Sequence, residues 1–395
     1  MRPEIATRLL HEPTLRTPAF VIDTATLRAD ALTVQQAAET AGATPLFALK
    51  SFSILNGLRI IAEAVDGFAA SSLFEARLAR HVLAATQTVH VTTPGLLPRE
   101  LGTLFDIADY ISFNSLSQWQ RGAGLAAARA KCGLRINPAL SFVADPRYDP
   151  CRRHSKLGVP VPQLESLLGT SADALNGITG LHFHTNCDSE DLAPLRTTVE
   201  ALLGSFSALW PRIEWVNLGG GYLFADPAHP EALAEAVAAI RARGPRKVFI
   251  EPGAGIARRA GSFVASVLDL FDSGGRQIAV LDTGITHMPE VFEYQFEPYV
   301  LGDTQEGEYV YLLAGPACLA GDILGEYAFA EPLRTGDRLI FPDMGAYSMV
   351  KANMFNGINL PDIYEIDGTG EIRLVKRFTY GDFAVLCGAS DAENP

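Results

Sequence analysis

Short apolar runs alternate with longer segments of helical periodicity through the first 250 or so residues of the chain. The intervening segments, such as residues 73–80 and 199–203, are rich in Ala and Leu. Strands that alternate with helices indicate βαβ units and a parallel sheet. Eight such strands favour a (β/α)8 TIM-like barrel over an open sheet. We predict them near residues 45–49, 67–70, 88–92, 110–113, 133–137, 178–184, 215–218 and 248–251.

The pattern changes after residue 259, where apolar runs are linked by turns rich in Gly, Pro and Asp without long helical segments. This pattern predicts a C-terminal, mostly antiparallel β domain, joined by an N-terminal strand near Phe20. The fold class is therefore α/β, with a barrel over residues 25–260 and a β domain over residues 1–24 and 261–395. Its C-terminal strands are predicted near residues 262–270, 277–282, 309–313, 338–341 and 372–378.

Composition narrows the choice of function. A formal net charge of −13 argues against a nucleic-acid partner. No apolar run approaches the roughly 18 residues of a membrane span, and the first ten residues lack the order of a signal peptide. The five cysteines are scattered without CxxC spacing, which predicts neither a disulfide framework nor a metal site. We expect a soluble cytoplasmic protein.

Lys50 closes the first predicted barrel strand, after the apolar run 45–49. A lysine at the rim of a buried sheet is partly desolvated, which can lower its pKa enough for the amine to act as a nucleophile. Such an amine can hold a carbonyl cofactor as a Schiff base. The alternative is a lysine whose stem lies along the strand end while its ammonium stays in water.

Other polar residues also stand at predicted strand ends, where barrel enzymes place their chemistry. His182 and His184 alternate on one strand, so one imidazole could lie flat on a planar cofactor, or both could be hydrogen-bonded core histidines. Gly219, Gly220 and Gly221 offer backbone amides that could surround a phosphate, or form a simple turn.

Glu251 closes the eighth predicted strand and precedes a glycine-rich turn that contains Gly253. A carboxylate there could pair with a protonated heterocyclic nitrogen. The alternative partner is Arg135, which stands in the fifth predicted strand. Lysine, histidine, glycines and glutamate at four strand ends together predict an active site.

These residues, in this order, resemble the fold-type III pyridoxal-phosphate decarboxylases, the group of ornithine and diaminopimelate decarboxylases. The likeness extends from Phe20 to Phe378 and includes Gly315-Pro316-Ala317-Cys318 and Phe355-Asn356-Gly357. Within the group, the chain is most similar to the carboxynorspermidine/carboxyspermidine decarboxylases. That likeness rests on the strings at residues 70–75, 182–186, 318–322 and 347–351.

The resemblance implies a role for each residue around pyridoxal 5′-phosphate. Lys50 would bind the cofactor covalently, His184 would stack on its ring, and Glu251 would pair with its ring nitrogen. Cys318 would enter from the neighbouring subunit of a head-to-tail homodimer and return a proton after carbon dioxide leaves. The other implied cofactor-binding residues are Gly219, Gly220, Gly221, Gly253, Arg135 and Tyr347.

The resemblance also implies a carboxylated polyamine substrate, with conversion to norspermidine or spermidine. Its cationic nitrogens need acidic or polar partners, and the candidates are Asp322, Glu290, His287 and Asp282. Alternatives are another decarboxylase of the group, acting on diaminopimelate, arginine or ornithine, and a catalytically inactive regulatory homologue. An inactive homologue would be expected to lack Lys50 or Cys318. A racemase would need a catalytic tyrosine where this chain has Cys318.

Overall fold

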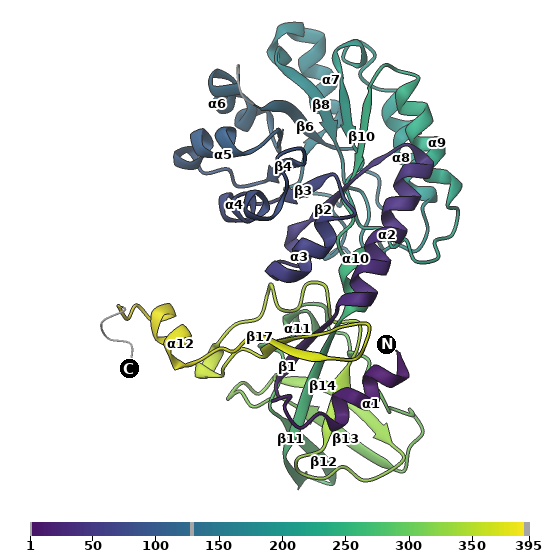
Figure 1. Cartoon of the computed structure of the whole chain (residues 1–395). Coiled ribbons are helices and arrows are strands. Elements are labelled where there is room, and N and C mark those ends of the chain that lie inside the picture. Colours follow the sequence, from purple (N-terminus) through teal and green to yellow (C-terminus); the bar gives the residue numbers. More distant parts are fainter. Residues whose placement is uncertain (1, 127–129, 391–395) are drawn as a thin grey trace. The chain divides into compact units, whose positions relative to one another are not determined.

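The computed structural model describes residues 2–126 and 130–390. Contacts divide the chain into a barrel unit, Arg28–Ile256, and a sheet unit, Met1–Leu27 with Ala257–Pro395. The elements of both units are labelled in Figure 1. No helix among the described residues is long and apolar enough to cross a membrane.

The barrel unit confirms the predicted (β/α)8 architecture. Its strands pair in parallel in the order β5-β4-β3-β2-β10-β9-β8-β6, and a further pairing between β5 and β6 closes the ring. The short β7 (Val159–Pro160) adds to β6 outside the ring. The ring strands are β2 (Thr44–Ala48), β3 (Gly67–Ala70), β4 (Thr88–Thr93), β5 (Tyr110–Phe113), β6 (Lys131–Asn137), β8 (Ile178–His182), β9 (Trp215–Asn217) and β10 (Lys247–Ile250).

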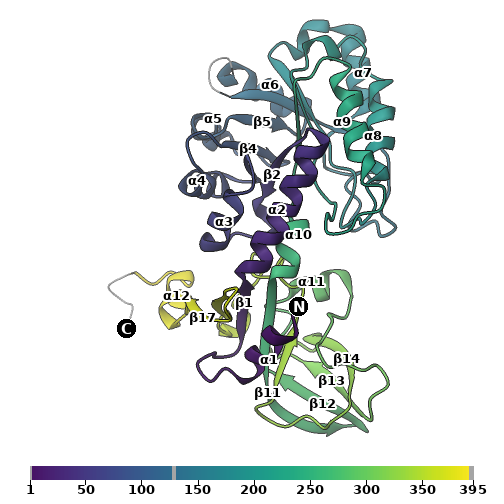
Figure 2. The same ribbon diagram turned by 45° about the vertical axis from the view of Figure 1, so that its right-hand side comes forward.

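Helices surround the strands, as Figures 1 and 2 show, and each of the longer ones returns the chain to the start of the next strand. Helices α8 and α9 lie side by side against one part of the barrel wall. Ser72 caps α4 by accepting a hydrogen bond from the backbone of Glu75. The helices of this unit are α2 (Thr24–Ala41, which follows β1), α3 (Leu55–Ala62), α4 (Leu73–Val82), α5 (Leu101–Ile107), α6 (Leu116–Ala126), α7 (Val161–Thr170), α8 (Ala193–Leu203), α9 (Glu231–Arg241) and the one-turn α10 (Ala254–Ala257).

The barrel interior is filled by large aromatic side chains near the amino ends of the strands. Trp215 and Phe249 pack on Tyr110 with ring centroids 5.2 Å apart in each pair. Gly180 leaves room for the indole, because a Cβ there would lie 1.9 Å from Trp215. This packed aromatic layer fills the interior near the amino ends of the strands, and the candidate active-site residues lie at the carboxyl ends.

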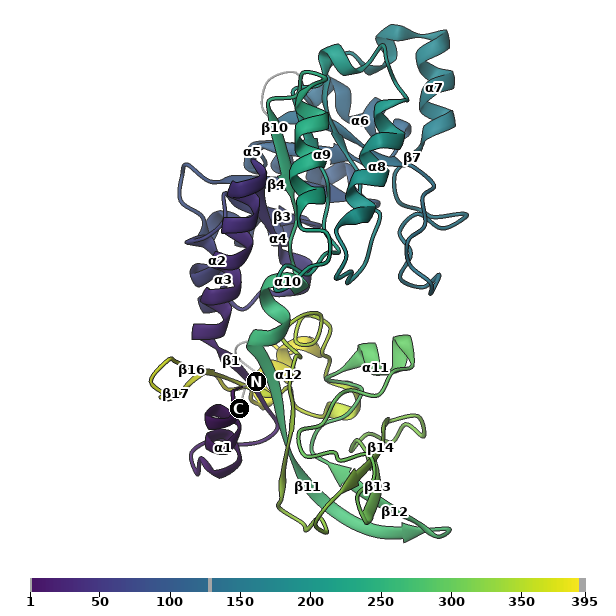
Figure 3. The same cartoon turned by 90° about the vertical axis from the view of Figure 1, so that its right-hand side faces the viewer.

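The sheet unit has the strand order β14-β13-β12-β11-β1-β16-β17, with β15 also paired to β11. The N-terminal β1 lies between β11 and β16 in this sheet. The sheet is mixed rather than antiparallel throughout, because β1–β16 and β12–β13 are parallel pairs. The long β11 and its partners are seen in Figure 3. The strands are β1 (Ala19–Asp23), β11 (Gly261–Ser273), β12 (Arg276–Leu281), β13 (Tyr309–Ala314), β14 (Ile323–Phe329), β15 (Arg338–Phe341), β16 (Asp362–Ile366) and β17 (Ile372–Lys376).

Three short helices complete the sheet unit: α1 (Pro3–His11), α11 (Pro289–Tyr294) and α12 (Tyr380–Leu386). The strand predictions missed β14 and β16. Both contain buried apolar residues beside acidic ones, such as Glu326 and Glu365, so their hydrophobic pattern is interrupted. Pairing with β13 and with β1 decides these strands, which is a tertiary effect.

Candidate active site

Lys50 follows the carboxyl end of β2 and lies in the one-turn 3₁₀ helix Leu49–Ser51. Its side chain is open to solvent, whereas Leu49 and Ser51 are buried. The protein around the ammonium still removes much of its hydration, which lowers the pKa of Lys50, and the charge of Glu251 only partly opposes this. The amine can therefore lose its proton more readily than an ordinary lysine.

The turn after β10 packs directly on the turn that carries Lys50. The backbone N–H of Ala48 donates to the carbonyl of Pro252 at 3.0 Å. Gly253 is needed for this approach, because a Cβ there would lie 2.8 Å from Ser51 Oγ. Residues that follow β10 and residues that follow β2 are thereby held at one end of the barrel.

Glu251 is buried at that end, with 6 % of its surface exposed. Asn217 Nδ2 donates to Glu251 Oε1 at 2.7 Å, and His182 Nε2 lies 3.9 Å from Oε2. Burial raises the pKa of Glu251, while the charge of Lys50, the bond from Asn217 and the charge of Arg135 lower it. The Arg135 side chain, itself buried, acts on Glu251 through its charge, and the contacts of the carboxylate are with Asn217 and His182.

His184 is oriented by the glycine turn. The N–H of Gly220 donates to His184 Nδ1 at 3.1 Å, so the neutral ring carries its proton on Nε2. Burial lowers the pKa of His184 well below its ordinary value, and the charges of Lys50 and Arg135 add to this effect. The imidazole is thus a neutral, fixed plane.

The glycine triplet is also required for packing. Gly219 has a φ of +70°, and a Cβ there would lie 2.4 Å from the carbonyl oxygen of Phe183. A Cβ on Gly220 would lie 2.1 Å from the carbonyl oxygen of Glu251. The N–H of Gly219 donates to Asn217 Oδ1 at 2.8 Å, so it and the amide of Gly220 already have acceptors inside the protein. Phosphate binding by Gly219, Gly220 and Gly221 stays a prediction.

Three residues at this end of the barrel were given no role from the sequence. Asn217 joins Glu251 to Gly219, Cys151 Sγ lies 3.6 Å from the carbonyl oxygen of His184, and the charge of Glu75 acts on Lys50. Asn217 could have been found because it ends a strand directly before the glycines. Cys151 and Glu75 carry no such signal.

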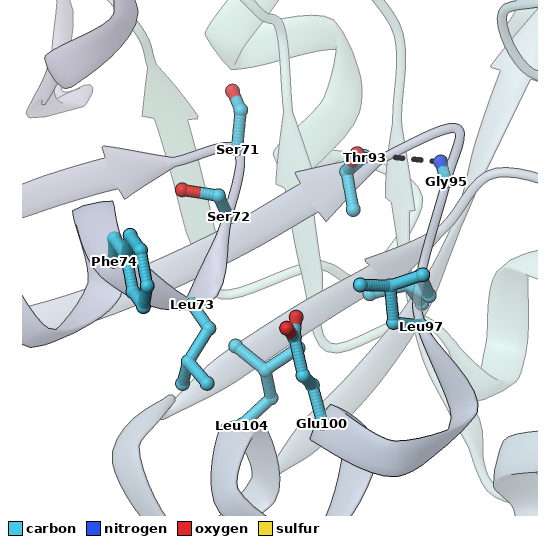
Figure 4. Close-up of a pocket in the computed structure, with 10 residues that line it drawn as sticks. Ser71, Ser72, Leu73, Phe74, Thr93, Gly95, Leu97, Glu100 and Leu104 are labelled. Carbon is cyan, nitrogen blue, oxygen red and sulfur yellow. Dashed lines mark hydrogen bonds between the residues drawn. The ribbon is translucent and has the colours of Figure 1, made fainter. Parts of the chain in front are cut away.

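A groove of about 200 Å³ lies at the carboxyl ends of β3 and β4 (Figure 4). Its lining is mainly apolar, with Leu73, Phe74, Leu97 and Leu104, while Ser71, Ser72, Thr93 and Glu100 supply polar groups. Phe74 is 78 % exposed.

In the sheet unit, Cys318 is exposed, and its backbone N–H donates to Asn356 Oδ1 at 2.8 Å. Asp322 is buried and holds the same loop. Its Oδ1 accepts from the N–H of Ile285 at 2.8 Å, and its Oδ2 accepts from the N–H of Ala317 at 2.9 Å. Both oxygens are used by the backbone, so this geometry gives no support to substrate binding by Asp322.

The other predicted substrate residues also have protein partners. Glu290 Oε1 accepts from Lys351 Nζ at 3.0 Å, and Asp282 Oδ1 accepts from the N–H of Ser266 at 2.9 Å. His287 is buried, with Nδ1 3.0 Å from Thr283 Oγ1, and burial lowers its pKa to about 4.

Tyr347 adopts a φ of +59°, an uncommon conformation for a residue with a side chain, and its ring lies 5.9 Å from Lys351 Nζ. Backbone strain of this kind persists where the surrounding structure holds a side chain in a required place. Whether Tyr347 reaches the cofactor stays a prediction.

The arrangement in the barrel fits pyridoxal phosphate. An amine with a lowered pKa, a buried carboxylate and a neutral imidazole plane are the groups that would hold its carbonyl, its ring nitrogen and its ring face.

Comparison with known proteins gives the same indication. A family model described as "Pyridoxal-dependent decarboxylase, C-terminal sheet domain" matches residues 19–345. The carboxyaminopropylagmatine decarboxylase of Synechocystis sp. is 38% identical, covering 96% of this chain and 98% of the relative. The carboxynorspermidine/carboxyspermidine decarboxylase of Campylobacter jejuni is 31% identical, covering 94% of this chain and 98% of the relative.

A solved structure supports the fold over the same length. The crystal structure of carboxynorspermidine decarboxylase complexed with norspermidine, from Campylobacter jejuni, is 30% identical, with a TM-score of 0.83. It covers 94% of this chain and 100% of that chain. With the lysine, the carboxylate and the histidine brought to one end of the barrel, the chain belongs to the pyridoxal-dependent decarboxylase family and uses pyridoxal phosphate.

Proposed function

We propose that this enzyme decarboxylates carboxynorspermidine or carboxyspermidine and forms norspermidine or spermidine in polyamine biosynthesis. The observation that carries the chemistry is the pair formed by Lys50, with its lowered pKa, and the buried Glu251. The substrate class is supported by near full-length similarity to the Campylobacter jejuni enzyme and to the structure with norspermidine.

Each side chain at the barrel end has a defined task in this proposal. Lys50 binds the cofactor covalently through Nζ and, as a neutral amine, can accept and release a proton there. Glu251 keeps the proton on the ring nitrogen, which its ionised carboxylate favours. His184 supports the ring face. When bound, pyridoxal phosphate supplies an electron sink for the bond that releases carbon dioxide.

We assign the phosphate contacts to Gly219, Gly220, Gly221 and Gly253, with the charge of Arg135 nearby. Gly253 lies beside the Lys50 turn, and the triplet lies beside His184 and Glu251. Their position at the carboxyl ends of the strands is where barrel enzymes hold phosphates. Because two of the triplet's amides donate to protein groups, Gly221 and the turn at Gly253 are the better candidates for direct contact.

The sheet unit supplies the remaining residues in our proposal. Cys318 Sγ–H returns a proton to the carbon that has lost carbon dioxide, and Tyr347 contacts the cofactor. We propose that both come from the partner of a head-to-tail homodimer. Cys318 is exposed beside two other exposed apolar side chains, Leu319 and Phe355, as a residue that enters a partner's site would be.

A second substrate is favoured by one observation, the 38% identity to the carboxyaminopropylagmatine decarboxylase. That substrate ends in a guanidinium rather than an amine. A guanidinium presents a planar fork of donors that suits bidentate pairing with a carboxylate, whereas an ammonium is a point charge. Glu290 of the sheet unit now accepts from Lys351. To bind the guanidinium, such a carboxylate would have to release Lys351.

The test is a substrate panel with the cofactor-loaded protein. Carbon dioxide release is measured from carboxynorspermidine, carboxyspermidine, carboxyaminopropylagmatine and diaminopimelate. We expect kcat/KM to be highest for one of the three carboxylated polyamines. Highest turnover of diaminopimelate would contradict the proposed substrate class, and binding of the cofactor without turnover of any substrate would favour the inactive homologue.

A further inference from the structure

His182 is a buried imidazole to which the proposed mechanism gives no task. It is the last residue of β8, and only 1 % of its side chain is exposed. Both ring nitrogens lack a hydrogen-bond partner among the described residues. Buried polar atoms without partners are rare in folded proteins, because each one loses its bonds to water and gains none in return. Its place in the core therefore needs an explanation.

Burial, aided by nearby charges, keeps His182 neutral. Burial lowers its pKa well below the ordinary value, and Arg135 on β6, Lys50 after β2 and His90 on β4 act in the same direction. Glu251 after β10 is the carboxylate that faces it, and Asn217 on β9 stands opposite it in the strand register. A neutral imidazole has one N–H donor and one acceptor, so its effect on Glu251 depends on which nitrogen carries the proton.

The carboxylate of Glu251 has one oxygen bonded and one available for this imidazole. Asn217 Nδ2 donates to Oε1 at 2.7 Å, whereas Oε2 lies 3.9 Å from His182 Nε2. That separation exceeds a hydrogen bond by about 1 Å, so the two side chains would have to move together for the imidazole to donate to the carboxylate. His182 ends β8, Asn217 ends β9 and Glu251 directly follows β10, so the three residues stand at the ends of adjacent strands.

We propose that His182 is a positioning residue for Glu251: its neutral imidazole donates Nε2–H to Oε2 while Asn217 donates to Oε1. Together the two donors hold the carboxylate ionised and in a fixed plane. This inference rests on the proposed function for its purpose, since an ionised Glu251 is what the ring nitrogen of the cofactor requires. Its geometry concerns the protein alone.

The inference predicts a matched difference between two substitutions. Gln at position 182 can place an amide N–H near the site of Nε2–H, whereas Met fills a similar volume without a donor. In the cofactor-free protein, His182→Met should raise the midpoint of Glu251 protonation by about one pH unit, a tenfold change in its ionisation ratio. His182→Gln should restore most of that shift.

The midpoint is measured by infrared titration of the carboxylic acid band, with Glu251→Gln to identify the signal. The pair His90→Gln and His90→Met is the control, because His90 is also buried but stacks on Tyr110 and bonds to Thr88. These control variants should leave the midpoint in place. An unmoved midpoint in His182→Met, or equal shifts in Gln and Met variants, would overturn the inference.

A second measurement does not depend on the Met variant, so it decides the question even if that variant does not fold. Nitrogen-15 spectra of the wild-type imidazoles, with His182→Gln to assign the signal, should show the proton of His182 on Nε2. A proton on Nδ1 would refute the donor role. Cofactor binding is measured separately by equilibrium dialysis, where we expect affinity to fall about tenfold in His182→Met and far less in His182→Gln. If the wild type binds no cofactor, the proposed function fails. The titration still tests whether His182 acts on Glu251, because it uses the cofactor-free protein.

Discussion

The barrel end and the loops of the sheet unit use charged residues in opposite ways. At the barrel end, loss of hydration lowers the pKa of Lys50, and burial raises the pKa of Glu251. In the sheet unit, two of the acidic residues predicted to bind substrate already have partners, because Asp322 binds two backbone amides and Glu290 binds Lys351. Groups whose pKa is shifted are suited to chemistry, whereas acids whose oxygens are already hydrogen-bonded or ion-paired stabilise the structure. An acid in a characteristic motif can therefore belong to either class.

The largest expected effect concerns Lys50. Lys50→Ala should abolish the visible absorbance of the protein-bound cofactor and reduce decarboxylation by about 10⁴-fold or more, because the protein loses both a covalent link and a proton carrier. Absorbance before and after borohydride reduction, and carbon dioxide release, check this. Retention of the band in the variant would place the amine that binds the cofactor elsewhere.

Cys318 is the residue of the sheet unit for which we expect a chemical rather than a structural effect. Cys318→Ala should reduce formation of the correct amine by roughly 10²- to 10⁴-fold, since it removes the proposed proton donor. The unfolding free energy should barely change, because the side chain is exposed. Mixing this variant with Lys50→Ala tests the shared site: a hybrid dimer should regain activity, and no recovery would argue against a partner's cysteine.

The stability of the two units should respond differently to acid. Burial lowers the pKa of His182 and His184 well below the ordinary value and that of His90 to about 3, and all three lie in the barrel. Below about pH 6.5 the unfolded chain binds protons that these folded imidazoles refuse, so stability falls by up to about 1.4 kcal/mol per pH unit for each. The sheet unit has His287 as its corresponding group, with a pKa of about 4.

Urea unfolding of the cofactor-free protein at pH 7 and pH 5 measures this difference. All three tryptophans, Trp119, Trp210 and Trp215, lie in the barrel and report on it through fluorescence. Glu251 acts in the opposite sense, because its raised pKa lets the folded state take up a proton first as pH falls. The acid loss should therefore be steeper in Glu251→Gln, and a loss equal to wild type would show that Glu251 titrates normally.

Asp322 should prove to be a structural residue. Asp322→Asn removes one charged acceptor and places amide hydrogens against a backbone N–H, which should lower the unfolding free energy by roughly 3 kcal/mol. Hydrogen exchange at the amides of Ile285 and Ala317 should accelerate, since these are its two donors. A large rise in KM for the polyamine with unchanged exchange would instead assign Asp322 to the substrate.

Glu290 should give the smallest change in stability. Its ion pair with Lys351 is partly exposed, with side-chain exposures of 26% and 29%, and Lys351 also contacts Glu293 at 2.6 Å. Glu290→Gln should therefore cost less than about 1 kcal/mol in unfolding free energy. Thermal melts beside Asp322→Asn provide the comparison. A loss as large as that of the Asp322 variant would remove the distinction between exposed and buried acids.

The sequence alone determined the barrel and its order of strands, because the buried strands of a parallel sheet are short apolar runs at regular intervals along the chain. It also placed Lys50, His184 and Glu251 at strand ends, where residue type and position together indicate chemistry. The strands β14 and β16 were missed because acidic residues interrupt their pattern, and pairing with neighbours decides them.

Only the tertiary structure decided how the polar residues act on one another. The hydrogen bond from Asn217 to Glu251 joins residues 34 positions apart, and the bond from Ile285 to Asp322 joins residues 37 positions apart. His182 likewise lies near the carboxylate of Glu251, far along the chain. Sequence pattern reports burial along one strand or helix. Hydrogen-bond partners and pKa shifts depend on which strand ends meet, and closure of the barrel determines that.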